Sequence, residues 1–260
     1  MIFYFSGTGN TKWAASQLSI ELNEQLHFIP DEFHTDMTYT LAAGERLGFI
    51  IPVHGWRPPI LVRHFLSHCH FIHSDNIYTY VIYTAGDSIG KAVEIIESDL
   101  KPHGLTVDAA LTLIMPESYV GLPFMDTDPI NKEENKKKKA IEDLATFVND
   151  VIIPKKHGER QLVKGPLPAF FSGPVGSFFV NHLITDKRFH VDANRCILCG
   201  KCTTVCPVND IEQEKGYTPV WKHNGQCLTC FSCYHHCPTH AIEFGRQTQK
   251  KGQYFYTKNK

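Results

Sequence analysis

The sequence lacks a net charge of either sign and lacks an opening of the kind that directs secretion. Its 260 residues carry 26 Lys and Arg against 27 Asp and Glu, a formal net charge of -1. This balance gives no electrostatic reason to expect nucleic acid as a partner. Residues 1–5 read as a strand, without the basic and long apolar stretches of a signal peptide. We therefore expect a cytoplasmic protein with reduced thiols.

The sequence also lacks a long uninterrupted apolar run. The strongest candidate for a membrane segment, residues 165–185, contains Pro166, Pro168 and Pro174 together with several glycines. These residues disfavour a spanning helix, so we expect no membrane span. A hydrophobic content of 42% and a charged content of 20% are typical of a soluble globular chain. A chain of this length can bury a substantial core without disulfides, and we expect two domains.

The first part of the chain, residues 1–153, alternates short apolar runs with segments of helical periodicity. The runs expected as strands are nearly continuous in apolar residues: 2–5, 47–51, 77–83 and 111–115, with a weaker one at 26–29. Such strands are typical of a parallel sheet buried on both faces. Between them, Ala14, Leu18 and Leu22 recur at helical spacing, and residues 132–151 read as a long helix. We therefore predict an α/β domain with a doubly wound, five-stranded parallel sheet.

Cysteine usage changes abruptly after a segment rich in Gly, Pro and Phe. Residues 154–188 read as a connector, residues 189–245 as a small second domain with little periodicity, and residues 246–260 as a basic tail. The tail has five basic residues, no acids and the aromatic run Tyr254-Phe255-Tyr256. We expect this tail to be solvated.

Eight of the nine cysteines form two copies of the run C-x2-C-x2-C-x3-C-P, so the second domain is internally duplicated. Three thiolates at two-residue intervals can hold three irons of a cubane, while the fourth, at a helix start, points toward the other cluster. We therefore predict two [4Fe-4S] clusters with crossed ligands. Cluster one takes Cys196, Cys199, Cys202 and Cys237, and cluster two takes Cys227, Cys230, Cys233 and Cys206.

Other metal sites explain these cysteines less well. Tetrahedral zinc is the alternative, but zinc sites usually use paired C-x2-C units and have no need of a third close cysteine. Cys69 lies outside both runs and is expected to be a buried or idle thiol. The histidines around it could in principle hold a metal, although a helix surface explains them more simply. They are His64, His68, His70 and His73.

The two runs, with residues 189–191 before the first and 241–244 after the second, resemble the bacterial-type ferredoxins with two clusters. The resemblance implies a small α+β ferredoxin-like domain that transfers single electrons.

Directly after the first strand, a loop of six residues leads into a helix. Backbone N–H groups at a helix start can bind an anion, hydroxyls can add hydrogen bonds, and the two glycines let the backbone approach closely. The loop lacks the G-x-G-x-x-G spacing of dinucleotide sites and the Gly-Lys-Ser/Thr ending of triphosphate loops. A monophosphate therefore fits best, and a simple helix cap is the alternative. The loop consists of Ser6, Gly7, Thr8, Gly9, Asn10 and Thr11.

The first strand and this loop resemble the FMN phosphate loop of the flavodoxins, and two further segments stand where that fold has its flavin loops. They follow the third and fourth strands, at the carboxyl ends where open α/β sheets bind ligands. The segments are Pro52, Val53, His54, Gly55 and Trp56, and Thr84, Ala85, Gly86 and Asp87. The resemblance implies bound FMN, with His54 or Trp56 stacked on the flavin. We expect this site to lie wholly on the first sheet, and core packing is the alternative for Trp56.

Taken whole, and including residues 115–119 after the last strand, the chain resembles the flavodoxin and ferredoxin fusion proteins of anaerobic bacteria and archaea. Two positions depart from that pattern. His54 stands where an aromatic residue such as Tyr is expected, and the acid of Asp87 would oppose negative charge on a reduced flavin.

Three functions are compatible with this organisation. The resemblance favours an electron-transfer protein that passes single electrons between the clusters and FMN and on to a redox partner protein. A flavin-dependent reductase of a small substrate is the alternative, with His54, Tyr119 and Asp87 as candidate proton donors and no residue singled out as catalytic. A redox sensor or binding protein with structural clusters is the third. The sequence leaves open whether the chain is an enzyme, and in which direction its electrons flow.

Overall fold

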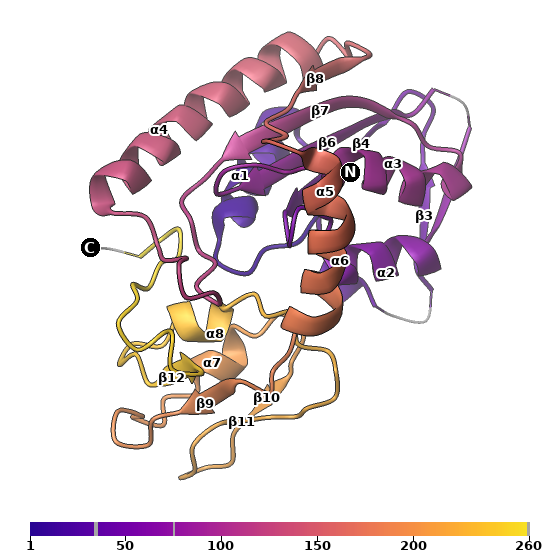
Figure 1. Ribbon diagram of the computed structural model, residues 1–260. Helices are drawn as coiled ribbons and strands as arrows, with labels where there is room; N and C mark the ends of the chain where they lie inside the picture. The colour runs from indigo at the N-terminus through magenta and orange to yellow at the C-terminus, as the bar shows by residue number, and fades with distance from the viewer. Residues whose placement is uncertain (34–35, 75, 259–260) are drawn as a thin grey trace.

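The computed structural model describes residues 1–33, 36–74 and 76–258. The N-terminal part is a parallel sheet with helices packed on it, and the C-terminal part is a smaller body of short strands and helices (Figure 1). The two parts lie against each other, and the last described residues run back toward the N-terminal part (Figure 1).

The main sheet has six parallel strands in the order β2-β1-β4-β6-β7-β8. They are β1 (Ile2–Tyr4), β2 (Leu26–Phe28), β4 (Arg46–Pro52), β6 (Tyr78–Ala85), β7 (Val107–Ile114) and β8 (Glu159–Gln161). All five predicted strands are present, but the predicted number is wrong. β8 lies in the segment predicted as a connector and pairs with Ala109, Ala110 and Leu111 of β7. Its three residues are polar because an edge strand is partly open to water, so it carries no apolar run.

Helices cover both faces of this sheet. α1 (Asn10–Leu22) and α4 (Ile130–Phe147) pack on one face, and α2 (Ile60–His68) and α3 (Ala92–Leu100) pack on the other. Neighbouring strand residues therefore enter opposite cores, as Ile50 faces α1 and α4 while Ile51 faces α2 and α3. Burial on both faces explains why the central strands are almost entirely apolar. The sheet is wound on both sides, as predicted.

A small second sheet sits beside the main one. Its two parallel strands are β3 (Thr38–Leu41) and β5 (His70–His73). The four histidines of the histidine-rich segment therefore lie on two elements. His64 and His68 lie on α2, as expected, whereas His70 and His73 lie on β5 and not on a helix. Cys69, between them, is only 2% exposed. Short helical turns complete this part: η1 (Ile29–Glu32), η2 (Lys101–His103) and η3 (Val148–Ile152).

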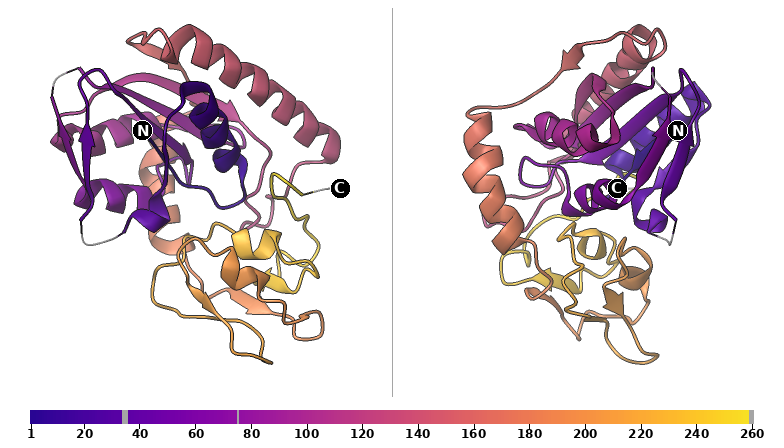
Figure 2. Two further views of the ribbon diagram at one scale, coloured as in Figure 1. Left: turned by 180° about the vertical axis from the view of Figure 1, so that it is seen from behind. Right: turned by 90° about the vertical axis from the view of Figure 1, so that its right-hand side faces the viewer.

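A continuous helical stretch, residues 168–183, occupies much of the predicted connector, and we call it the side helix. It stands along one edge of the molecule, at the outer left in the right-hand view of Figure 2. Two of its stretches have wide π-type turns, and one of them contains Pro174, which has no N–H to donate. Its segments are α5 (Pro168–Phe170), η4 (Phe171–Val175), α6 (Gly176–Phe178) and η5 (Phe179–Leu183). No helix in the described ranges is long and apolar enough to cross a membrane.

The C-terminal part is built from very short elements around an aromatic core. The rings of Phe189 and Trp221 stack with centroids 5.4 Å apart, and Phe231 and Phe244 pack against Phe189. Each of its two helices begins inside a cysteine run. The elements are β9 (Phe189–Val191), α7 (Lys201–Thr204), β10 (Ile211–Glu212), β11 (Val220–Trp221), α8 (Ser232–His235) and β12 (Ile242–Phe244).

The segment predicted as a solvated tail is packed onto the molecule. Thr248 is fully buried and Tyr254 is 1% exposed, and the ring of Tyr256 stacks on Trp13 of α1 at 5.3 Å. The prediction was wrong for residues 246–258, because the aromatic side chains among the basic ones find apolar partners. Residues 259–260 of the predicted tail lie outside the described residues.

Candidate functional site

The eight cysteines of the two runs line two small cavities. The first cysteine cavity is lined by Cys196, Cys199, Cys202 and Cys237, and the second by Cys206, Cys227, Cys230 and Cys233. Each cavity thus receives three cysteines from one run and the last cysteine of the other run. Within residues 1–33, 36–74 and 76–258, no group of three or more His, Cys, Asp or Glu side chains is arranged to hold a single metal ion.

Left-handed backbone conformations and backbone N–H donors occur around the sulfurs of these cavities. Leu198 and Thr229, each inside a cysteine run, have left-handed backbones with φ of 58° and 48°. Backbone N–H groups donate to three of the sulfurs: Asp210 to Cys206, Thr229 to Cys227 and Ala241 to Cys237, at 3.2 to 3.5 Å. Such bonds favour negative charge on sulfur and tune the redox potential of iron–sulfur centres.

Burial makes Cys202 and Cys230 poor nucleophiles as free thiols. It raises the pKa of Cys202 to about 11 and the pKa of Cys230 to about 12. Free thiols with such values stay protonated at neutral pH. A coordinated metal deprotonates its thiol ligands outright, so the cysteines suit metal ligation better than nucleophilic chemistry.

A larger cavity of about 160 Å³, which we call the sheet-edge cavity, lies at the carboxyl ends of β1, β4, β6 and β7. The chain places β2 on one side of β1 and β4 on the other, so the strand order reverses there. Open α/β sheets bind ligands at this position. Every residue predicted from the three loops lines the cavity except Gly9: Ser6, Gly7, Thr8, Asn10, Thr11, Pro52, Val53, His54, Gly55, Trp56, Thr84, Ala85, Gly86 and Asp87.

The first loop lines the cavity just before α1, and several of its polar groups bond to one another or to neighbouring segments. Gly9 precedes α1 with φ of 96°, a conformation that favours glycine, and its N–H donates to Ser6 Oγ. Thr11 Oγ1 is 2.7 Å from Thr84 Oγ1, and Thr8 Oγ1 donates to Ser118 Oγ. The hydroxyl of Thr8 thus already donates within the protein, whereas Ser6 Oγ accepts a bond and keeps its own proton to donate. The first N–H groups of α1 have no partner inside the helix, and N–H groups at this position can donate to an anion.

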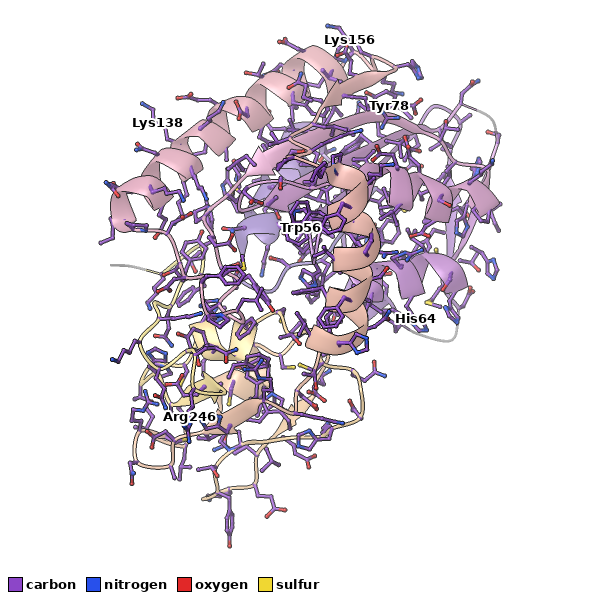
Figure 3. All side chains as sticks on the ribbon, in the orientation of Figure 1. Trp56, His64, Tyr78, Lys138, Lys156 and Arg246 are labelled. Atoms are coloured by element: carbon purple, nitrogen blue, oxygen red, sulfur yellow. The ribbon has the colours of Figure 1, made fainter. Side chains whose placement is uncertain are left out.

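The second loop carries the two predicted stacking residues. Trp56 lies beside the side helix (Figure 3). It donates from Nε1 to Ser88 Oγ, and its ring packs on Phe171 of the side helix with centroids 4.7 Å apart. Trp56 therefore has core-type packing and also lines the cavity. Burial lowers the pKa of His54 to about 4, so this side chain is neutral at neutral pH.

The side helix ties the second loop to the start of α3, which follows the third loop. Ser172 Oγ accepts the N–H of Lys91 and donates to the carbonyl of Trp56, both at 2.8 Å. Arg57 donates to Ser177 Oγ at 2.7 Å, and a Cβ placed on Gly55 would lie 2.7 Å from the ring of Phe179. The sequence showed this segment only as rich in Gly, Pro and Phe. Its role as a clamp was missed, since the partners are more than 80 residues away.

Glu117, in the loop after β7, is a half-buried carboxyl in the wall of the cavity. Its Oε1 accepts the N–H groups of Ser118 and Tyr119 at 2.9 Å, yet burial raises its pKa. Gly86 has no Cβ, which leaves space for this carboxyl. The sequence placed Glu117 within residues 115–119 but assigned it no role.

The C-terminal part completes the wall of the sheet-edge cavity. Leu228, Thr229 and Cys230 line it, and Leu228 and Cys230 also line the second cysteine cavity. A Cβ placed on Gly7 would lie 3.0 Å from Cβ and 3.4 Å from Sγ of Cys230. The expectation that this site lies wholly on the first sheet is therefore wrong, because the second cysteine run packs directly on the first loop.

Comparison with known proteins identifies the second part. Residues 188–238, which contain both cysteine runs, match the model of the 4Fe-4S dicluster domain. Over 80 residues the chain is 32% identical to a ferredoxin of Pyrobaculum islandicum, an alignment that covers 28% of this chain and 72% of that protein. No solved structure matches the chain. Through its C-terminal part, the chain therefore belongs to the ferredoxins that carry two [4Fe-4S] clusters and transfer electrons.

Proposed function

We propose that this chain is an internal electron relay, in which the two clusters exchange single electrons with FMN bound in the sheet-edge cavity. The observation that carries the proposal is the position of Cys230, in the wall of both the second cysteine cavity and the sheet-edge cavity. A cofactor in the larger cavity would lie against a cysteine that ligates a cluster. Electron transfer between them would then need no encounter between separate molecules.

We assign the ligands of the clusters by the two cysteine cavities. Cluster one takes Cys196, Cys199, Cys202 and Cys237, and cluster two takes Cys206, Cys227, Cys230 and Cys233. Cluster two is then the one beside the sheet-edge cavity. Cluster one is the farther one and has the exposed Cys199 among its ligands. An outside redox partner would exchange electrons with cluster one.

Three features support FMN as the occupant of the larger cavity. The order β2-β1-β4-β6-β7 is the strand order of flavodoxins, and the cavity lies where that order reverses. The start of α1 offers backbone N–H groups to one terminal phosphate. The two other loops offer a half-buried wall for a flat ring system, and Ser172 ties the second of the three loops to the start of α3.

FMN, when bound, supplies a centre that accepts one or two electrons. The chain's own residues would bind and shield it. The first loop would hold the phosphate, Trp56 and Gly86 would flank the ring, and Phe179 and Leu228 would exclude water from its edge.

The packing of two of the three candidate proton donors, Tyr119 and His54, favours a relay over a reductase of a small substrate. The ring of Tyr119 packs against both Phe179 and Phe231, and burial raises its pKa to about 12. His54 is neutral, since its pKa is lowered to about 4. Neither side chain is poised to give a proton to a substrate at neutral pH.

The deciding experiment uses the full chain, purified without oxygen and supplied with iron, sulfide and FMN. We expect one FMN and two clusters per chain, and flavin reduction by a low-potential donor that follows cluster reduction. The rate of that second step should not change over a tenfold range of protein concentration, because the step is intramolecular. Failure to retain FMN, retention of FAD instead, or a rate proportional to concentration would contradict the proposal.

A further inference from the structure

The C-terminal segment, residues 252–258, lies across the loop at the start of α1. The N–H of Tyr256 donates to the carbonyl of Thr8 at 2.9 Å, and a Cβ placed on Gly9 would lie 3.0 Å from Cβ of Tyr256. The ring of Tyr256 stacks on Trp13 with centroids 5.3 Å apart and an interplanar angle of 20°. Lys137 of α4 donates to the Tyr256 carbonyl at 3.1 Å, so the segment is held on both sides.

The same segment fixes the side chain at the first position of α1. The hydroxyl of Tyr254 donates to Asn10 Oδ1 at 2.5 Å, while Asn10 Nδ2 donates to the carbonyl of Pro116 at 3.0 Å. Tyr254 is 1% exposed and Asn10 is 8% exposed. Both ends of the Asn10 amide are thus bonded to segments distant in sequence.

A buried histidine extends this contact to the ferredoxin part. The N–H of Tyr254 donates to Nδ1 of His235, so Nε2 of that ring carries the proton and donates to the carbonyl of Ser118 at 2.7 Å. Ser118 Oγ in turn accepts the hydroxyl of Thr8. The helix α8, the C-terminal segment and the first loop therefore form one hydrogen-bonded unit.

We propose that residues 252–258 act as a strap that sets the affinity of the first loop for the phosphate of FMN, an inference that rests on the function proposed above. Anion binding at a helix start needs several N–H groups to point at one place. A loop with two glycines does not hold that arrangement by itself. The strap fixes the Thr8 carbonyl and the Asn10 side chain before the ligand arrives, which reduces the entropy lost on binding.

Two variants test the strap on the full chain with both clusters present. Tyr254→Phe removes the hydrogen bond to Asn10, and Trp13→Leu removes the stacking on Tyr256 at a site distant in sequence from the cysteine runs. Tyr217→Phe, at a side chain that is 69% exposed, is the control. Affinities for FMN and for riboflavin are measured anaerobically by flavin fluorescence, in samples whose cluster absorbance matches the parent protein.

We expect each strap variant to bind FMN about 3- to 10-fold more weakly, the effect of one hydrogen bond or ring contact. Riboflavin, which has no phosphate, should bind each variant as it binds the parent. Hydrogen exchange at the amide of Tyr256 should also slow when FMN is added to the parent, because coupling between two sites is reciprocal.

The outcomes separate this inference from the proposed function. FMN affinity equal to the parent in both strap variants would overturn the strap and leave the relay intact. An equal loss for riboflavin and FMN would also overturn it, since the effect would then not concern the phosphate. A parent protein that binds no FMN would overturn the relay itself, and the strap with it. If Tyr254→Phe loses its clusters, Trp13→Leu alone decides.

Discussion

The two parts of this molecule hold their backbones in different ways. In the sheet, long strands such as β4 and β6 are buried on both faces and pair over seven residues. In the ferredoxin part, no described strand exceeds three residues and each helix has four. Of the eleven described non-glycine residues with positive φ, six lie between positions 198 and 240. Each such residue costs of order 1–3 kcal/mol. We therefore expect the second part to need its metal centres for stability, whereas apolar burial suffices for the first.

Removal of iron should produce the largest difference in stability between the two parts. Chelation from the reduced protein should leave the amides of β4, β6 and β7 protected and expose nearly all amides of residues 189–245. Binding of the metal is part of the folding free energy there, whereas the sheet has its own core. Hydrogen exchange read by mass spectrometry measures both parts at once. Persistent protection in residues 189–245 would show that the aromatic core around Phe231 suffices without iron.

Single cysteine substitutions should expose the ligands of one cluster and leave those of the other cluster protected. In Cys206→Ser the remaining ligands of cluster two, Cys227, Cys230 and Cys233, should become reactive to alkylation. The ligands of cluster one, Cys196, Cys199, Cys202 and Cys237, should stay protected. Cys237→Ser is the matched variant and should give the reverse pattern, because each cavity receives the last cysteine of the other run. Alkylation sites are mapped by mass spectrometry. Loss of protection within the same run as the substitution would overturn the crossed assignment.

The contact between the two parts is tested by adding one methyl group. In Gly7→Ala the new Cβ would lie 3.0 Å from Cβ of Cys230, so the first loop and the second cysteine run must move apart. Overpacking of this kind typically costs about 1–3 kcal/mol, and we expect weaker FMN binding and slower reduction of the flavin. Gly173→Ala is the control, since nothing lies within 4 Å of the added Cβ. Flavin titration and stopped-flow absorbance measure the two effects, and equal behaviour of both variants would argue against a tight contact.

The smallest expected effect is the pH dependence that His54 gives to the free energy of unfolding of the first part. The pKa of His54 is lowered to about 4 by burial, below its value in the unfolded chain. The unfolded chain therefore binds one more proton between pH 4 and about 6.5, and the free energy of unfolding should fall as pH falls through that window. One proton corresponds to about 1.4 kcal/mol per pH unit, and the partial exposure of His54 makes the expected slope smaller.

Urea unfolding of the iron-free protein, followed by circular dichroism, measures this slope without interference from the clusters. His54→Gln should unfold with a shallower pH dependence than the parent over pH 4 to 6.5. Identical slopes would show that His54 is protonated in the folded sheet as easily as in the unfolded chain.

Sequence patterns succeeded where the physical cause is local or periodic. Five strands were predicted because burial on both faces requires apolar runs, and β8 was missed because its residues Glu159 to Gln161 are polar. The three loops were predicted because parallel strands present their carboxyl ends at one edge. The side helix was not predicted, since prolines and glycines obscure its periodicity.

The sequence by itself determined which chemistry the second part performs. Two copies of one cysteine spacing bring thiols within reach of a cubane, and that depends only on a short stretch of backbone. Only the tertiary structure decided what surrounds the sheet-edge cavity. Cys230 contacts Gly7, and Tyr254 bonds to Asn10, which lies 244 positions away in the sequence. Both contacts form because the surfaces of separate segments pack together. Such contacts depend on the complementarity of folded surfaces, which leaves no periodic or short-range signal in the chain.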